Sequence, residues 1–356
     1  MFQDIAALER PTSSRSMFGF FKPAPHPLAG SVDARAQGWM RREEAIMGTA
    51  IGVELWCENG AQGEAATEAV LAEMHRIDRA MSPHKPDSEL SRINRDAAAG
   101  PVEVSEEMMR LLQRAADFSV LSGGAFDLTY AAIGHLYDYR ARVQPTPEQI
   151  EKARAAVGHR FLELDARRST VRFARPGMRI DLGGFAKGHA VDNAATILQS
   201  HGIRHANVSA GGDSRVLGDR RGRPWSIGIR DPRRAGEVVA VLPLEDVSIS
   251  TSGDYERCFD DGGERCHHLI DPATGRSPKG VRSVTVLADD GLTSEAMSKT
   301  VFVMGVQRGL RLVEAMPGVD AVVVDADGRL HYSSGLAAPL REAPREGASR
   351  FPMTTT

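Results

Sequence analysis

The fold is decided by Ile180-Asp181-Leu182-Gly183-Gly184-Phe185-Ala186-Lys187-Gly188-His189-Ala190-Val191-Asp192. The apolar run 171–180 before it predicts a strand, and the apolar spacing after it predicts a helix over 187–200. Paired glycines let a backbone approach a ligand closely or take positive φ. A helix N-terminus offers free N–H groups to a phosphate. The stretch therefore indicates a site for a charged, phosphate-bearing ligand, although a tight turn with a surface lysine would use the same residues.

Two common phosphate-binding motifs are excluded. The stretch lacks the Gly-x-x-x-x-Gly-Lys-Ser/Thr spacing of a Walker A loop, and it lacks the Gly-x-Gly-x-x-Gly dinucleotide fingerprint. The rest of the chain must therefore identify the ligand.

Composition indicates an ordinary soluble globular protein. The 356 residues are 42% hydrophobic and 26% charged, with a net charge of -3 that gives no sign of nucleic-acid binding. Cys57, Cys258 and Cys266 form neither a disulfide framework nor a zinc pattern. There is no apolar run long enough for a signal peptide or a membrane span. We therefore expect a cytoplasmic protein, either a monomer or a homodimer.

The chain divides into three parts. Residues 1–42 are rich in Pro, Ser, Ala and Arg and predict a mobile leader, and the Pro- and Thr-containing end, residues 336–356, predicts a disordered tail. Residues 43–335 are expected to form the folded domain. Its strands come in runs rather than in strict strand–helix alternation, which favours an α+β fold over a doubly wound sheet.

The pattern predicts the following elements inside this domain. Helices are expected at 61–80, at 106–121 with Ser105 as N-cap, from Pro147 with Thr146 and Gln149 as a capping box, and at 187–200 and 295–316. Strands are expected at 46–56, 161–164, 170–173, 206–209, 225–229, 238–243, 247–251, 281–287 and 321–324.

Further polar, glycine-containing loops lie between these strands. They are 207–213 (Asn-Val-Ser-Ala-Gly-Gly-Asp), 250–256 (Ser-Thr-Ser-Gly-Asp-Tyr-Glu), 267–275 with His268 and Asp271, and 293–299 with Glu295 and Lys299. Each has an ordinary explanation, as a turn, a satisfied histidine or a helical salt bridge. Their number favours convergence on a ligand.

Seven motifs in order resemble the ApbE family of flavin transferases (FAD:protein FMN transferases). They are Ile46–Thr49, Asp87–Asn94, Gly124–Asp127, Asp181–Gly188, Val208–Asp213, Ser250–Glu256 and His268–Gly275. The resemblance spans residues 44–334 and implies an α+β fold related to the T-fold.

That resemblance also implies the chemistry. Family members move the FMN half of FAD onto a threonine or serine hydroxyl of a target protein, release AMP and use Mg²⁺. His268 falls on the histidine proposed to assist transfer. The metal positions are Gly184, through its carbonyl, with Glu295 and Ser298 as further candidates. The FAD-contact positions are Met47, His84, Ala125, Phe126, Asp127, Asp181, Lys187 and Ile270.

One departure concerns the metal. Where the family has an aspartate followed four residues later by a threonine, this sequence has Glu295 and Lys299. A charged lysine offers donors and no acceptor, so it cannot replace a threonine ligand. Three interpretations stay open: the ion shifts to oxygens of Glu295, Thr293, Ser294 or Ser298, Lys299 itself neutralises the pyrophosphate, or a neutral Lys299 amine ligates.

Export is a second departure, because many family members are lipoproteins or periplasmic. The missing signal favours a cytosolic target or a wrongly chosen start. Two rival functions share the same motifs. One is a protein that binds FAD without transferring FMN, which Lys299 favours. The other is a hydrolase that cleaves FAD to FMN and AMP with water.

Overall fold

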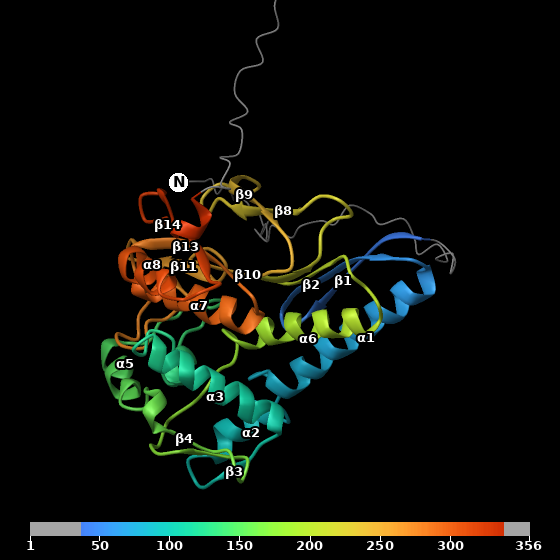
Figure 1. The fold of residues 1–356 in the computed structure, drawn as a ribbon. Helices are drawn as coiled ribbons and strands as arrows, with labels where there is room; N and C mark the ends of the chain where they lie inside the picture. Colours follow the sequence, from blue (N-terminus) through green and yellow to red (C-terminus); the bar gives the residue numbers. More distant parts are fainter. Residues whose placement is uncertain (1–36, 338–356) are drawn as a thin grey trace, which may run out of the picture.

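An eight-stranded sheet forms the frame of residues 37–337, the part of the chain that the computed structural model describes (Figure 1). The strand order is β1-β2-β6-β7-β10-β13-β14-β15, and each pair of neighbours is antiparallel. The α+β class expected from the sequence is thereby confirmed. The bounds are β1 Gly38–Ile46, β2 Thr49–Cys57, β6 Ala206–Ala210, β7 Asp213–Leu217, β10 Ser248–Gly253, β13 Val281–Ala288, β14 Asp320–Asp325 and β15 Leu330–Tyr332.

Three smaller sheets accompany the large one. One has the order β3-β5-β4, and the other two are the hairpins β8–β9 and β11–β12. Their bounds are β3 Val102–Glu103, β4 Leu162–Asp165, β5 Thr170–Phe173, β8 Trp225–Arg230, β9 Val238–Leu244, β11 Cys258–Asp261 and β12 Glu264–His267.

The helices are mostly those that the apolar spacing predicts. Ser105 caps α3 and Thr146 forms the capping box of α5, as expected. The expected helix 295–316 is instead two helices, because Gly305 takes φ 79° and breaks it. The bounds are α1 Gly60–Met81, α2 Glu89–Asp96, α3 Glu106–Leu121, α4 Ala131–Gly134, α5 Pro147–Arg154, α6 Ala186–Ser200, α7 Gly291–Met304 and α8 Val306–Glu314. Across residues 37–337, every helix is too short or too polar to cross a membrane.

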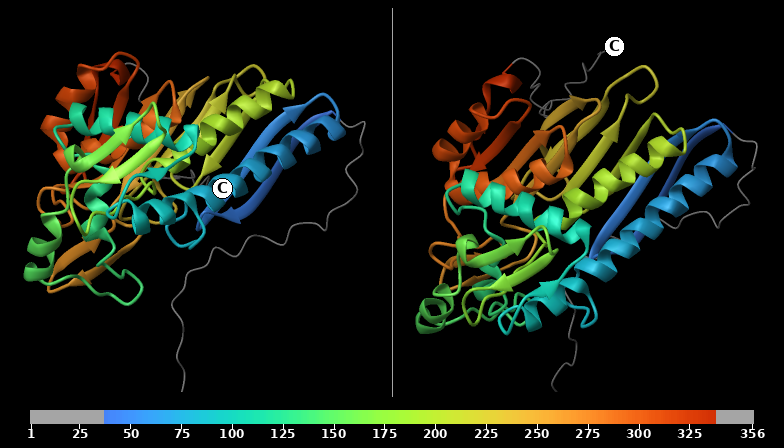
Figure 2. Two further views of the ribbon diagram at one scale, coloured as in Figure 1. Left: turned by 90° about the horizontal axis from the view of Figure 1, so that it is seen from below. Right: turned by 60° about the horizontal axis from the view of Figure 1, so that its bottom comes forward.

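The large sheet is covered on both faces. Helices α1, α6 and α7 lie over one face, and the β8–β9 hairpin lies over the other (Figures 1 and 2). Alternate residues of β14 show this division, since Ala321 and Val323 join the main core with the helices while Val322 joins the smaller core under β8–β9. The alternation follows from the period of two along a strand.

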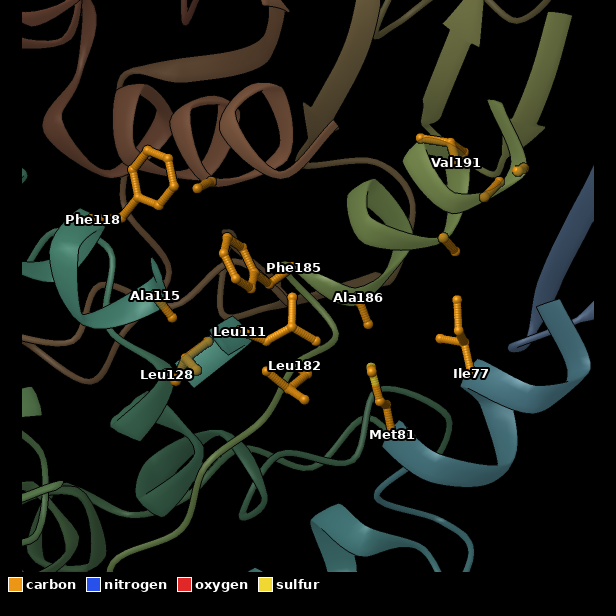
Figure 3. Close-up of a cluster of buried hydrophobic side chains, with 14 of the residues drawn as sticks. Ile77, Met81, Leu111, Ala115, Phe118, Leu128, Leu182, Phe185, Ala186 and Val191 are labelled. Carbon is orange, nitrogen blue, oxygen red and sulfur yellow. The ribbon is translucent and has the colours of Figure 1, made fainter. Parts of the chain in front are cut away.

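The quoted stretch leaves the sheet before the helix begins. The strand expected over 171–180 is wrong beyond Phe173, where β5 ends and an irregular segment runs to α6. Asn94 of α2 holds this segment by bonds to both backbone groups of Ile180, at 2.9 and 2.7 Å. Leu182 and Phe185 insert among apolar side chains of α1, α3 and α6 (Figure 3). Its apolar residues are thus buried against helices rather than in a strand.

Two boundaries at the N-terminal side differ from expectation. Residues 38–42, assigned to the leader, belong to β1, an edge strand whose partly exposed residues show no clear alternation. Trp39 packs edge-on against Trp56 and Trp225, with ring centroids 5.7 and 5.4 Å apart. The run 46–56 is not one strand, because Met47 (φ 54°) and Gly48 (φ 68°) form the turn between β1 and β2.

The remaining leader, residues 1–36, lies outside the described residues, as does most of the expected tail. At the tail boundary, Leu336 is buried in the smaller core, so the folded part extends at least one residue beyond the expected end at 335.

A glycine pair lets the N-terminal ends of α6 and α7 meet. A Cβ added at Gly188 would overlap the carbonyl oxygen of Gly291, and one at Gly291 would overlap that of Gly188. These are backbone atoms, so they cannot rotate away as a side chain can. Only glycine at both positions allows this approach.

Substitution Gly188→Ala should therefore destabilise the protein. Overpacking against backbone costs about 1–3 kcal/mol, which urea denaturation would measure as a lower free energy of unfolding. Gly100→Ala is the matched control, since nothing lies within 4 Å of a Cβ there and φ is not positive. Equal stability of the two variants would contradict the close contact.

Candidate functional site

At the N-terminal ends of α6 and α7, a carboxylate from each helix accepts backbone N–H groups of the other, while Asp290, the N-cap of α7, accepts the N–H of Thr293 at 2.7 Å. Asp192 of α6 accepts hydrogen bonds from the N–H groups of Gly291 at 2.8 Å and Leu292 at 3.3 Å. Glu295 of α7, which is fully buried, accepts the N–H of Gly188 at 2.7 Å. Burial, with the nearby Asp290 charge, raises the pKa of Asp192 to about 6. Each anion lies where a positive helix end favours it.

Lys187 joins these helices to the sheet. Its ammonium contacts Glu295 Oε1 and lies 2.7 Å from Asp213 Oδ2, at the start of β7. Burial would lower the pKa of Lys187, but the two carboxylates outweigh it and raise the pKa. Burial would likewise raise the pKa of Asp213, but Lys187 and Lys299 hold it below its usual value. Lys187 and Asp213 therefore stay charged near neutral pH.

Lys299 is the second ammonium of this cluster. Its Nζ lies 3.2 Å from Glu295 Oε1, so the helical pair expected from the sequence does form, but in a buried position. Its stem passes within 3.2 Å of the point where Gly184 would carry a Cβ. Gly183 and Gly184 do not take positive φ, and at Gly184 the missing side chain leaves room for this lysine. Burial lowers the pKa of Lys299.

Three buried hydroxyls lie on the sheet side of α7. Ser298 Oγ lies 3.0 Å from Ser250 Oγ and 2.8 Å from Ser252 Oγ, both on β10. It also donates to the backbone carbonyl of Glu295 at 2.9 Å. These bonds use the Ser298 hydroxyl in packing α7 against β10.

His268 follows β12 and has an unpartnered ring atom. Its Nδ1 is buried and makes no hydrogen bond with the described residues. Burial, followed by the charges of Lys299 and Arg257, lowers the pKa of His268 to about 3. The imidazole is therefore neutral at physiological pH. Arg257, whose carbonyl accepts the His268 N–H at 3.1 Å, is exposed and has no acidic side chain within ion-pair distance among residues 37–337.

Some side chains predicted to contact the flavin also pack or form hydrogen bonds within the fold. Phe126 packs with Phe185, at 5.7 Å between ring centroids, and Ile270 lies in a small core near Ile133. Asp127 Oδ1 accepts from the N–H and hydroxyl of Thr129, and its Oδ2 accepts from the N–H of His159 at 2.7 Å.

The other predicted positions lie on turns. Asp181 Oδ1 accepts the N–H of Gly183, and its charge reaches Tyr130, whose pKa is raised first by burial and then by Asp181. Ala125 lies half-buried in the turn after α3, and Met47 occupies the β1–β2 turn. His84 is exposed after α1, and its N–H bonds locally to Ser82 Oγ at 3.3 Å.

The structure thus brings together Gly184, Lys187, Glu295 and Ser298, with His268 within electrostatic reach. Sequence reasoning did not single out Asp213, Arg257, Ser250 or Ser252 as site residues. All four lie inside the quoted polar loops or directly after them, so the signal was present. The sequence does not show which side chains of these loops lie next to Lys187 and Lys299.

We expect Lys187→Met to destabilise the protein, because it leaves Asp213 buried without its cation. Breaking a buried pair from one side costs about 3–5 kcal/mol, which urea denaturation at neutral pH would measure. The loss should shrink in acid, where Asp213 can be protonated.

The matched control is Lys279→Met, whose exposed pair with Glu264 should contribute less than about 1 kcal/mol. An equally small loss in Lys187→Met would show that the buried cluster does not hold α6 to β7.

Comparison with known proteins identifies the family. The model of the ApbE family matches residues 47–323. The FAD:protein FMN transferase of Treponema pallidum is 34% identical over 320 residues, which cover 84% of this chain and 88% of that protein.

Two solved structures have the same fold. The ApbE protein of Thermotoga maritima aligns with a TM-score of 0.79 and 34% identity, covering 85% of this chain and 100% of that one. The flavin transferase ApbE of Vibrio cholerae aligns with a TM-score of 0.75 and 30% identity, covering 84% and 98%. With the fold, the motifs and the family model in agreement, the chain belongs to the ApbE family.

Proposed function

We propose that this protein is an FAD:protein FMN transferase that acts on a threonine or serine hydroxyl of a target protein. The observation that carries the proposal is the Lys187–Glu295–Asp213 cluster, with the neutral His268 within reach of its charges. The relatives named as flavin transferases support the same reaction. The identity of the target, the cytoplasmic location and the oligomeric state stay predictions.

The reaction replaces the phosphoanhydride bond of FAD with a phosphoester bond to the acceptor hydroxyl. The acceptor oxygen attacks the phosphorus on the FMN side of FAD and forms a new P–O bond. The bond from that phosphorus to the bridging oxygen breaks, and its electron pair leaves with AMP. The acceptor hydroxyl loses its proton, so a base is needed near the attacking oxygen.

His268 is the proposed base. A neutral imidazole can take the hydroxyl proton, and its depressed pKa keeps it unprotonated in the free protein. Binding of the negative pyrophosphate would oppose the lysine and arginine charges that lower this pKa. The base would therefore become stronger when the substrate is bound.

Flavin binding is assigned to the groups around the N-terminus of α6. We propose that Lys187 and the N–H groups of the glycine turn meet the pyrophosphate charge. Met47, Asp181 and His84 would contribute from their turns, and positions 125–127 and 270 from the backbone. The folded domain that carries these groups begins with β1.

The magnesium ion implied by the resemblance does not fit the residues present. Both Glu295 oxygens already accept hydrogen bonds, and the Ser298 hydroxyl is used between two serines. Within residues 37–337, no three His, Cys, Asp or Glu side chains gather to hold a metal. An ammonium about 4 Å from a dication would repel it by about 8 kcal/mol at an effective dielectric of 20. No step here is therefore assigned to a metal.

His268→Ala should keep FAD affinity and lose transfer. Removing a general base typically slows the reaction by about 10²–10⁴-fold. Mass spectrometry would count FMN adducts on an acceptor peptide carrying a threonine, and AMP release would be measured in parallel. His201→Ala, at the far end of α6, is the control.

Three outcomes would count against this proposal. Undiminished transfer in His268→Ala would remove His268 from the mechanism. Intact FAD without adduct in the unmodified protein would favour a flavin-binding protein. Free FMN with AMP would favour the hydrolase.

The pH profile gives a separate test. The pH dependence of kcat/KM for FAD reports the pKa values of groups in the free protein. There the pKa of His268 is lowered to about 3. We therefore expect no loss of kcat/KM between about pH 8 and pH 5, where a histidine with the ordinary pKa of about 6.5 would be protonated. The inflection in kcat should lie at a higher pH than that in kcat/KM. A fall in kcat/KM centred near pH 6.5 would contradict the depressed pKa.

A further inference from the structure

We propose that the Lys299 ammonium takes the place of a divalent cation at this site, so that flavin binding by this chain requires no magnesium. The inference rests on the proposed function for the identity of the ligand. Its test includes a metal titration that needs no flavin.

The first argument is position. Lys299 Nζ lies 3.2 Å from Glu295 Oε1, and the lysine stem lies against Gly184. Gly184 and Glu295 are two of the positions at which the resemblance implies metal ligands. The side chain therefore brings a positive charge to the place that an ion would need.

The second argument is the donor set. Mg²⁺ requires near-octahedral oxygen ligands, usually one or two carboxylates with waters and phosphate oxygens. Here Glu295 Oε1 accepts from Lys187 and Lys299, and Oε2 accepts from Gly188. Asp213 Oδ1 is the one carboxylate oxygen of these two residues that has no hydrogen-bond partner among residues 37–337. A single free oxygen beside two ammonium groups is a poor magnesium site.

The third argument is charge. Lys187 and Lys299 balance Glu295 and Asp213, so the cluster is neutral without a metal. A dication would leave an excess of two positive charges until the pyrophosphate arrived. Substituting a neutral threonine for Lys299 would leave one negative charge in excess, which a cation could compensate. The lysine and the metal are therefore alternatives.

A metal titration of the unmodified protein is the first test. Mn²⁺ is the probe, followed by electron paramagnetic resonance on the metal-stripped protein, with and without FAD. We expect no protein-bound ion in either sample. One bound Mn²⁺ per chain that is lost in Glu295→Gln would overturn the proposal, whether or not the protein transfers FMN.

Flavin affinity gives the second measurement. FAD fluorescence would be titrated in EDTA and in excess magnesium, and the unmodified protein should bind equally well in both. In Lys299→Thr, affinity in EDTA should fall by about 10- to 100-fold, the scale of one lost charged hydrogen bond, and magnesium should restore it. Lys279→Thr, on an exposed lysine, should behave like the unmodified protein.

Two results would overturn the inference here. One is a magnesium requirement for FAD binding in the unmodified protein. The other is a folded Lys299→Thr variant whose FAD affinity is unchanged in EDTA. Tight, metal-independent FAD binding by the unmodified protein without any FMN adduct would support the proposal that Lys299 replaces the metal. It would also contradict the proposed transfer.

Discussion

The structure depends on two helix N-termini that point at each other. Their positive ends would repel, and their free N–H groups would be left buried without acceptors. Carboxylates address both problems, because Asp192 and the N-cap Asp290 accept N–H groups of α7 and Glu295 accepts one of α6. The glycine contact at 188 and 291 allows the approach, and Lys187 then reaches Glu295 and Asp213 at once. The positions of the charged groups in the site thus follow from how the N-terminal ends of α6 and α7 pack against each other.

Two of the buried side-chain atoms that lack a hydrogen-bond partner within residues 37–337 belong to residues of the candidate site. Asp213 Oδ1 and His268 Nδ1 are buried without hydrogen-bond partners among the described residues. Such groups cost free energy in a folded protein and need an explanation. The hydroxyl of an acceptor protein would supply a hydrogen-bond donor to this region, whereas a flavin pyrophosphate would supply acceptor oxygens and negative charge. The exposed Arg257, beside the β1–β2 turn and His268, adds a cation at its edge.

Much of the fold could be predicted because apolar spacing and capping residues are local signals. The helix at 106–121 and the strand at 170–173 have the expected bounds. The failures arise from tertiary structure or rare backbone states. Met47 takes positive φ, which is uncommon for a non-glycine residue, so the turn it forms was hidden within an apolar run. Met178 and Ile180 belong to the apolar run 171–180 that predicts a strand, but they are buried in the main core beyond the end of β5 at Phe173.

The site divides in the same way. The order and identity of the motifs were enough to predict Gly184, Lys187 and Glu295 as site residues. Predicting Asp213 required knowing which strand begins beside α6. Lys299 shows the limit most clearly. A glutamate and a lysine four residues apart are common on exposed helix faces, where they contribute only about 0.2–0.5 kcal/mol. Here Glu295 is fully buried and shared with a second lysine. The same spacing therefore describes a solvated surface pair or a cation built into a ligand site, and only burial distinguishes the two.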